Sequence, residues 1–337
     1  METSMNRRML LATLGLTAAL AAHANPEFKW TLAYLPVTGT TYYDAALQLP
    51  ERIGKATKGR VQVTANGSLV PGTRMLEAVR DGDVQMSMVL SGYYTASQPL
   101  FTLVSLPGYS ESFADLDRVM ASPYGAAMRE VFARDYKARE LLFSAFCPQT
   151  VFSTKPVQTL EDWKGLRVRV NNAGTAVLAN VLSAKPVSLS AGEVLPALQR
   201  GVVDAVVTDA CWAYGAGFYT AVKHAAAWKL GSVVPWHVMV GQEAWAKLPA
   251  DLQQAVEGEL ASMARELRAD YAAKVEALPK QWEAKGVKYH VVTEAENRKV
   301  LDPKHMGAVQ DAWYQQAKPR NVDAQKWEAV ARDALKR

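Results

Sequence analysis

The alternation of strands and helices in the first third of the chain limits most strongly what it can fold into. The predicted order is strand, helix, strand, helix, strand, over residues 28–35, 42–57, 60–65, 73–81 and 84–90. Asn66-Gly67 and Pro71-Gly72 mark a loop between the second strand and the second helix. This order predicts a mainly parallel sheet covered by helices, because helices link its successive strands. Ligands of such sheets bind beyond the carboxyl ends of the strands.

A second unit of the same kind follows. Its predicted strands cover residues 141–146, 166–170, 186–189 and 205–208, and its predicted helices cover 174–182 and 191–200. The chain has 337 residues, and at roughly 150 residues per domain this length fits about two domains. Two α/β units of similar size therefore predict two lobes around a cleft.

The C-terminal part begins with a long amphipathic pattern. Apolar residues recur every three or four positions from Leu252 to Leu278. A helix of about 28 residues is about 42 Å long, enough to cross both lobes. We expect Asp251 to cap the start of this helix and Pro279 to end or kink it. The polar helical tail that follows carries Trp313 and Trp327 as expected anchors.

Residues 1–24 are typical of a signal peptide that is removed on export. Arg7 and Arg8 precede an apolar run, and Ala22-His23-Ala24 has the small-x-small form of a cleavage site. The run is too short for a membrane-spanning helix, which needs about 20 residues. We therefore expect cleavage before Asn25 and a mature protein in the periplasm.

Charge and motif content favour neither nucleic-acid binding nor catalysis. The formal net charge of +5 is spread along the chain, and no cluster of basic residues suggests a nucleic-acid partner. The common catalytic motifs are absent, and the histidines lack partners at metal-ligand spacing. We expect no enzyme activity, no cofactor and no metal. Cys147 and Cys211 can form one disulfide or remain two buried thiols, and the sequence leaves both open.

Seven segments, taken in order, resemble one known family. They are residues 57–63 (TKGRVQV), 66–69 (NGSL), 75–82 (MLEAVRDG), 84–91 (VQMSMVLS) with Leu106-Pro107, 162–170 (DWKGLRVRV), 193–205 (EVLPALQRGVVDA) and 244–249 (AWAKLP). Together they resemble the DctP-type solute receptors of tripartite ATP-independent periplasmic (TRAP) transporters. The resemblance covers about residues 28–285.

The resemblance implies an α/β, two-lobed, periplasmic-binding-protein-like fold. Each lobe would be a mainly parallel sheet flanked by helices, and the long helix would brace both lobes. Residues 25–146 with 235–274 would form lobe I, and residues 147–234 with 275–337 would form lobe II. Such a receptor is a monomer that binds a small organic acid and delivers it to the membrane permease subunits.

The resemblance also places a ligand-binding arginine at Arg169. In the family this residue clamps the ligand carboxylate, a task that suits a permanently charged guanidinium with parallel donors. The alternative is an ordinary strand residue in solvent or in a salt bridge. Arg167 lies two positions earlier, on the same strand face by parity.

Asp209 departs from the sugar-acid receptors of the family, which usually carry Asn there. An ionised Asp repels a carboxylate, whereas Asn donates to one. Either the ligand offers a hydrogen-bond donor to Asp209, or Asp209 neutralises Arg169 in the empty site. The sequence leaves both interpretations open.

The remaining candidates suggest a less polar site than that of the sugar-acid receptors. Gln149 and Leu90 replace charged residues of those receptors, and aromatic residues stand nearby to wall the cleft. The full set is Arg169, Asp209, Gln149, Trp212, Tyr93, Leu90, Tyr94 and Asn171.

We therefore expect a receptor for a monocarboxylate, either aromatic or hydroxylated. A dicarboxylate or sugar acid is the alternative ligand, and it would need a second cation, for which Arg167 and Arg74 are the candidates. A sensor input module and a secreted enzyme are the alternative functions.

Overall fold

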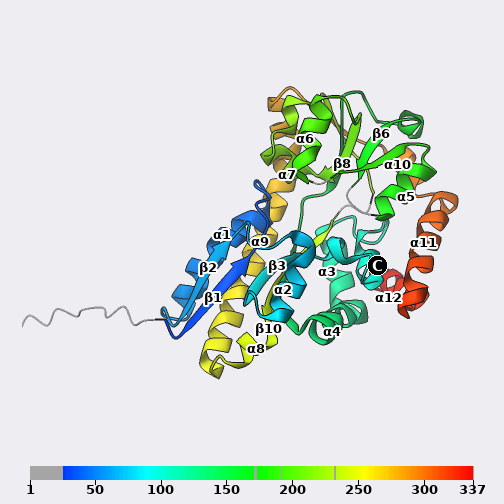
Figure 1. Ribbon diagram of the computed structural model, residues 1–337. Helices are drawn as coiled ribbons and strands as arrows, with labels where there is room; N and C mark the ends of the chain where they lie inside the picture. Colours follow the sequence, from blue (N-terminus) through cyan, green and yellow to red (C-terminus); the bar gives the residue numbers. More distant parts are fainter. Residues whose placement is uncertain (1–25, 171–172, 190, 231–232, 337) are drawn as a thin grey trace, which may run out of the picture.

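A computed structural model describes residues 26–170, 173–189, 191–230 and 233–336. The predicted signal peptide and the candidate Asn171 lie outside these described residues. Two β-sheets form the centres of two lobes, with helices around each (Figure 1). The predicted two-lobed α/β fold is confirmed.

The sheet of lobe I has five strands in the order β2-β1-β3-β10-β4. Their bounds are β1 (Phe28–Ala33), β2 (Val61–Asn66), β3 (Met86–Leu90), β4 (Ala138–Ala145) and β10 (Pro235–Gly241). Strand β1 pairs in parallel with β2 and β3, whereas β10 is antiparallel to both of its neighbours. A strand from the second half of the chain thus completes the first sheet, and the sequence patterns did not identify it.

The sheet of lobe II has six strands in the order β11-β9-β5-β8-β6-β7. Their bounds are β5 (Gln149–Ser153), β6 (Arg167–Val170), β7 (Lys185–Ser188), β8 (Ala205–Asp209), β9 (His224–Ala227) and β11 (Lys288–Val291). Only β5 runs against its two neighbours, so this sheet is mainly parallel as predicted.

Helices flank both sheets. Those packed in lobe I are α1 (Thr41–Ala56), α2 (Met75–Asp81), α3 (Phe113–Ala121), α4 (Pro123–Tyr136) and α8 (Gln242–Ala246), and those of lobe II are α5 (Ala173–Val181), α6 (Ala191–Gln199) and α7 (Ala210–Gly215). Helix α1 begins where the Thr40 side chain accepts a hydrogen bond from the Tyr43 amide. It buries Tyr42, Leu49 and Ile53 in the core of lobe I.

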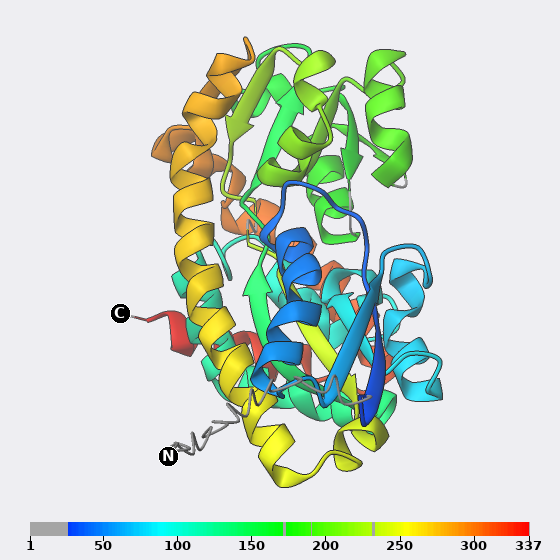
Figure 2. The ribbon, with the colours of Figure 1, turned by 90° about the vertical axis from the view of Figure 1, so that its left-hand side faces the viewer.

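Helix α9 (Ala250–Ala284) runs along both lobes (Figure 2). Its first part packs Leu252, Val256 and Leu260 into the core of lobe I, and its end packs Leu278 and Trp282 into the core of lobe II. At 35 residues it is about 52 Å long. The predicted bracing helix is therefore present and longer than expected.

The predicted cap of α9 is wrong, and of the two outcomes predicted for Pro279 the end of the helix is excluded. The helix begins after Pro249, and Asp251 lies in its first turn, where its carboxylate accepts a hydrogen bond from Arg60 Nη1 at 2.7 Å instead of capping the helix. Pro279 lies inside the helix, which continues to Ala284. Burial of Leu278 and Trp282 on both sides of Pro279 offsets the missing backbone hydrogen bond.

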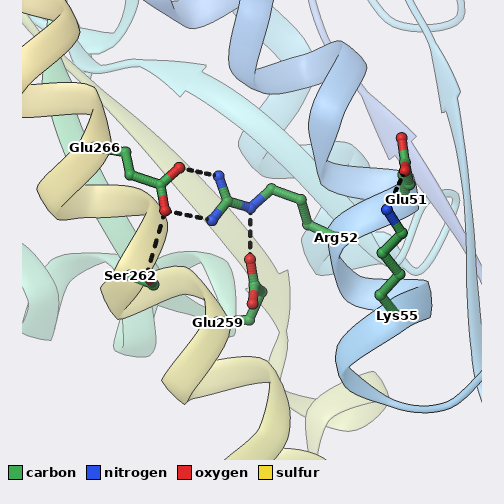
Figure 3. A network of polar contacts seen from close by, with 6 residues as sticks. All are labelled: Glu51, Arg52, Lys55, Glu259, Ser262 and Glu266. Atoms are coloured by element: carbon green, nitrogen blue, oxygen red, sulfur yellow. Dashed lines mark hydrogen bonds and ion pairs between the residues drawn. The ribbon is translucent and has the colours of Figure 1, made fainter.

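An ion-pair network joins α9 to α1 (Figure 3). Arg52 donates to Glu259 from Nε at 2.5 Å and to Glu266 from Nη1 and Nη2 at 2.5 and 2.8 Å. Nearer the cleft, Lys274 of α9 pairs with Asp44 of α1 at 3.1 Å. These contacts fix α9 against lobe I, so a rotation of the lobes has to bend or shift the segment beyond them.

The C-terminal helices contact both lobes. They are α10 (Glu294–Val300), α11 (Pro303–Ala317) and α12 (Ala324–Leu335). Helix α11 packs against α5, and its buried Trp313 donates from Nε1 to the Pro99 carbonyl of lobe I at 2.7 Å. Tyr109 of lobe I donates to Glu328 of α12 at 2.6 Å. These contacts join the C-terminal helices to both lobes, and the division of the chain between the lobes stays a prediction.

Within the part of the chain that the structure describes, no helix is both long enough and apolar enough to cross a membrane.

Candidate ligand-binding site

A cavity lies between the two lobes, and the empty space inside it and at its open mouth is together about 700 Å³. Lobe I and the segments that enter from it contribute Val37, Leu90, Gly92, Tyr93, Ser105, Phe146 and Val234, and lobe II contributes Gln149, Arg169, Ala191, Thr208, Asp209 and Trp212. The carboxyl ends of β3, β6 and β8 meet here, where the strand order predicts a ligand site. A wider, more open hollow shares Tyr93, Arg169 and Trp212 with the cavity, so the two form one cleft.

Arg169 lies on β6 and is only 6% exposed. Its Nε and Nη2 donate to the Leu189 carbonyl at 3.2 and 3.1 Å. Its Nη1 is buried and has no hydrogen-bond partner among the described residues. Burial lowers the pKa of Arg169, but a guanidinium still keeps its charge in proteins. The carbonyl thus fixes the guanidinium in place and leaves one charged donor available to an anion.

The other two candidate cations lie outside the cavity. Arg167 pairs with Asp204 on the surface, with Nε and Nη2 donating at 2.9 and 2.6 Å. Arg74 is exposed and does not line the cleft. Among the described residues that line the cleft, Arg169 is therefore the only basic side chain.

Asp209 ends β8 and caps α7. Its Oδ1 accepts the Trp212 amide hydrogen at 2.5 Å, while its Oδ2 is buried and has no hydrogen-bond partner in the part of the chain that the structure describes. Burial raises the pKa of Asp209 to about 7, although backbone N–H groups of Trp212, Cys211 and Cys147 act in the opposite direction. No ion pair joins Asp209 to Arg169 within the described residues. The interpretation that Asp209 neutralises Arg169 is therefore wrong for this conformation.

Cys147 and Cys211 form a disulfide, which resolves the alternative that the sequence left open. Both cysteines are buried, and their Cα atoms are 5.7 Å apart. The sulfur atoms lie with an Asp209 oxygen within 4.8 Å of one another, a grouping that could suggest a metal site. Because metal binding requires thiolates and both sulfurs are oxidised, this group does not fit a metal ion.

The structure brings four further candidates to the cavity. Gln149 begins β5 directly opposite Asp209 and is 5% exposed. Leu90 ends β3, Trp212 lies in the first turn of α7, and Tyr93 is partly exposed at the wall of the cleft.

Tyr94 is the candidate that does not belong to the site. It is buried in the core of lobe I, where its hydroxyl accepts the Leu76 amide hydrogen at 2.8 Å and donates to Glu77 at 3.2 Å. Tyr93 and Tyr94 both lie in a short 3₁₀ helix, η2 (Ser91–Tyr94). Because consecutive side chains of a 3₁₀ helix point in different directions, Tyr93 faces the cleft and Tyr94 does not.

Sequence reasoning missed several lining residues. Val37, Phe146 and Thr208 lie at or after the carboxyl ends of β1, β4 and β8, so the same strand-end rule could have found them. Ser105 ends the 3₁₀ helix η3 (Pro99–Ser105) and Val234 directly precedes β10, and neither had such a signal.

The lobes also touch beside the cavity. The segment between β1 and α1 reaches α7 of lobe II (Figure 2). A Cβ added to Gly215 would lie 2.5 Å from the Thr38 carbonyl oxygen, and one added to Gly39 would lie 3.0 Å from Gly215 Cα. The two backbones therefore approach as closely as two glycines allow.

Two α/β lobes that are spanned by one helix and enclose the buried Arg169 guanidinium between them are typical of the class of two-lobed solute receptors. The family model described as "Bacterial extracellular solute-binding protein, family 7" (DctP) matches residues 33–315. The chain belongs to this family, and the resemblance to TRAP solute receptors is confirmed.

Relatives and solved structures agree with this assignment. The solute-binding protein RD1_1052 of Roseobacter denitrificans is 26% identical over 257 residues, which cover 73% of this chain and 77% of the relative. The structure of DctP7 of Bordetella pertussis, a receptor binding pyroglutamic acid, has a TM-score of 0.78 at 22% identity and covers 90% of this chain and 99% of its own. A TRAP solute-binding protein of Desulfovibrio salexigens with bound orotic acid has a TM-score of 0.80 at 16% identity, with 91% and 100% covered.

Proposed function

We propose that this protein binds a small monocarboxylate between its lobes and delivers it to a TRAP permease in the membrane. One observation carries the proposal: Arg169 is buried in the inter-lobe cavity, and its Nη1 has no hydrogen-bond partner among the described residues, while a backbone carbonyl holds the other side of the guanidinium. Burial of a charge without a counter-ion raises the free energy of the folded protein. An anion that pairs with the Arg169 guanidinium offsets much of this penalty.

The proposal is for a ligand with one carboxylate because the described lining of the cleft has one cation. A dicarboxylate or sugar acid would leave a second charged or strongly polar group beside Leu90, Phe146 and Trp212. These side chains instead suit a flat or apolar ligand body. The acids in the two solved structures, pyroglutamic acid and orotic acid, each join one carboxylate to a ring, which supports the same ligand class.

Binding would favour a closed arrangement of the lobes. The cavity takes its walls from both lobes, so a ligand held by Arg169 of lobe II also contacts lobe I. Such a ligand shifts the equilibrium between open and closed forms by its differential affinity. The permease would then recognise the closed receptor in the periplasm, to which the predicted signal peptide directs the chain.

The first test is a thermal-shift screen of residues 25–337 against a library of organic acids. A ligand at 100 times its Kd stabilises the folded protein by about 2.7 kcal/mol, which is readily measured. We expect monocarboxylates to shift the wild type and not Arg169→Ala. Arg167→Ala is the matched control, since it removes a surface arginine of the same strand.

Three outcomes would contradict the proposal. Equal shifts in wild type and Arg169→Ala would reject Arg169 as the anchor. Stabilisation by neutral or cationic compounds alone would reject the carboxylate. Turnover of a bound acid would favour the secreted enzyme, and a sensor rather than a permease gene beside this one would favour a sensor input module.

A further inference from the structure

The fold makes no hydrogen bond to the second carboxylate oxygen of Asp209 among the described residues, although the N–H groups of Cys211 and Cys147 help to stabilise the carboxylate. Oδ1 caps α7 through the Trp212 amide, but Oδ2 has no partner among the described residues. The residue is 6% exposed and lines the cavity together with Arg169. A buried acceptor without a donor is destabilising, so its presence needs a reason beyond the helix cap.

Helix capping alone does not require a carboxylate. Ser, Thr and Asn cap a helix N-terminus about as well as Asp, and none of them places an acid in a buried cavity. A residue that caps α7 without Oδ2 would avoid the cost of burying a charge. The extra oxygen therefore serves the cavity rather than the helix.

We propose that Asp209 Oδ2 accepts a hydrogen bond from the ligand, so that the receptor selects monocarboxylates bearing an N–H or O–H donor. This inference rests on the proposed function and deepens it. Arg169 would hold the carboxylate from β6, and Asp209 would hold the donor from the end of the neighbouring strand β8. A ligand anchored at both points fixes its orientation in the cavity.

While Asp209 is ionised, the ligand cannot place a hydrogen-bond acceptor against Oδ2. A second carboxylate or a carbonyl oxygen facing Oδ2 would be repelled, because an ionised carboxylate only accepts hydrogen bonds. A ligand donor instead satisfies the orphaned oxygen and favours the charged form. Gln149, directly across from Asp209, borders the same region of the cavity.

The test compares acids that differ by one donor. The two probe pairs are L-pyroglutamate with N-methyl-L-pyroglutamate, and 4-hydroxyphenylacetate with phenylacetate. Titration calorimetry at pH 8 gives the ratio of affinities within each pair for the wild type, Asp209→Asn and Asp209→Ser. Asp204→Asn is the matched control, because Asp204 carries a carboxylate in the same lobe but pairs with Arg167 outside the cavity.

The helix cap makes the Asn variant informative. Only its amide oxygen can accept the Trp212 N–H, so its NH₂ group must take the place of Oδ2. We expect the donor to raise affinity by roughly 10- to 100-fold in the wild type for at least one pair, as for a hydrogen bond to a charged group. The ratio should fall below one in Asp209→Asn and to about one in Asp209→Ser, and Asp204→Asn should match the wild type.

Failure of the inference differs from failure of the proposed function. The first case is that the acids bind the wild type and Arg169→Ala abolishes binding. If the donor then has no effect on affinity in the wild type, or raises affinity in both Asp209 variants as much as in the wild type, the Asp209 inference is wrong and the proposed function stands. If none of the four acids, nor any acid of the thermal-shift library, binds the wild type, the proposed function fails and the inference fails with it. Circular dichroism of each variant confirms that α7 and the fold are retained.

Discussion

Gln149 and Asp209 are cross-strand partners at the point where β5 begins and β8 ends, and both line the cavity. The Cys147–Cys211 disulfide closes beside this pair, two residues before Gln149 and two residues after Asp209. The covalent bond therefore fixes the start of β5 against the first turn of α7. The two polar side chains keep their relative position as long as the disulfide is intact.

Removal of this disulfide should destabilise the protein and weaken ligand binding together. The bond closes a segment with a sequence separation of 64, for which the chain-entropy model gives about 4 kcal/mol. We expect Cys147→Ser combined with Cys211→Ser to lower the free energy of unfolding in urea by about 2–4 kcal/mol. The same variant should bind its acid more weakly, because the backbone N–H groups around Asp209 lose their fixed positions.

A reduced wild type is the control for the substitutions themselves. Reduction under conditions where the protein stays folded should produce the same loss of affinity as the double variant. An oxidised and a reduced protein with equal stability and equal affinity would show that the disulfide positions nothing at the site.

Asp209 should make the ligand-free protein less stable as pH rises. Burial raises its pKa to about 7 from the usual 3.8. Between these values the folded protein binds more protons at this site than the unfolded chain, so stability falls as pH increases from about 4 to about 7. The full effect is about 4 kcal/mol, at 1.36 kcal/mol per pKa unit.

The measurement is the difference in unfolding free energy between Asp209→Asn and wild type at pH 4.5 and pH 8. Lys274, Tyr271, Tyr93 and Arg169 are other ionisable groups near Asp209 or in its cavity, and they are present in both proteins. Asp209→Asn should gain stability relative to wild type by a few kcal/mol between the two pH values. A difference that does not change with pH would show that Asp209 titrates near its usual value.

Much of the fold could be predicted from the sequence because its strands and helices have clear local patterns. Strands β5, β9 and β10 were missed, since they are short or fully buried and pair only through the tertiary fold. The pairing that places Gln149 opposite Asp209 depends on β5, so it could not be predicted from local sequence patterns. Periodicity identified α9, but it could not show that burial of Trp282 carries the helix past Pro279.

Some of the site residues could likewise be predicted from the sequence, whereas the role of others depends on the tertiary structure. Arg169 and Asp209 were both predicted from the resemblance to the family, and both line the cavity in the structure. Tyr94 was assigned to the cleft by its proximity to Tyr93, but the direction of a side chain in a 3₁₀ helix depends on geometry that spacing does not give. Likewise the pairing of Arg167 with Asp204 could not be read from composition, although it decides which arginine is available to a ligand.

Gly215 should control how closely the lobes approach. A Cβ at this position would lie 2.5 Å from the Thr38 carbonyl oxygen and 3.0 Å from Gly39 Cα, and both are backbone atoms that yield only if the segment itself moves. We expect Gly215→Ala to separate the lobes at this contact and so to weaken binding of the acid by roughly 10-fold, or about 1.4 kcal/mol.

Gly258→Ala is the control, because nothing lies within 4 Å of its added Cβ and Ala in the middle of α9 should stabilise the helix by about 1 kcal/mol. Small-angle scattering with and without the acid separates the two effects: Gly215→Ala should stay more open than wild type when ligand is present, and Gly258→Ala should close like wild type. Wild-type affinity and closure in Gly215→Ala would mean that the contact between the β1–α1 segment and α7 does not belong to the ligand-bound form.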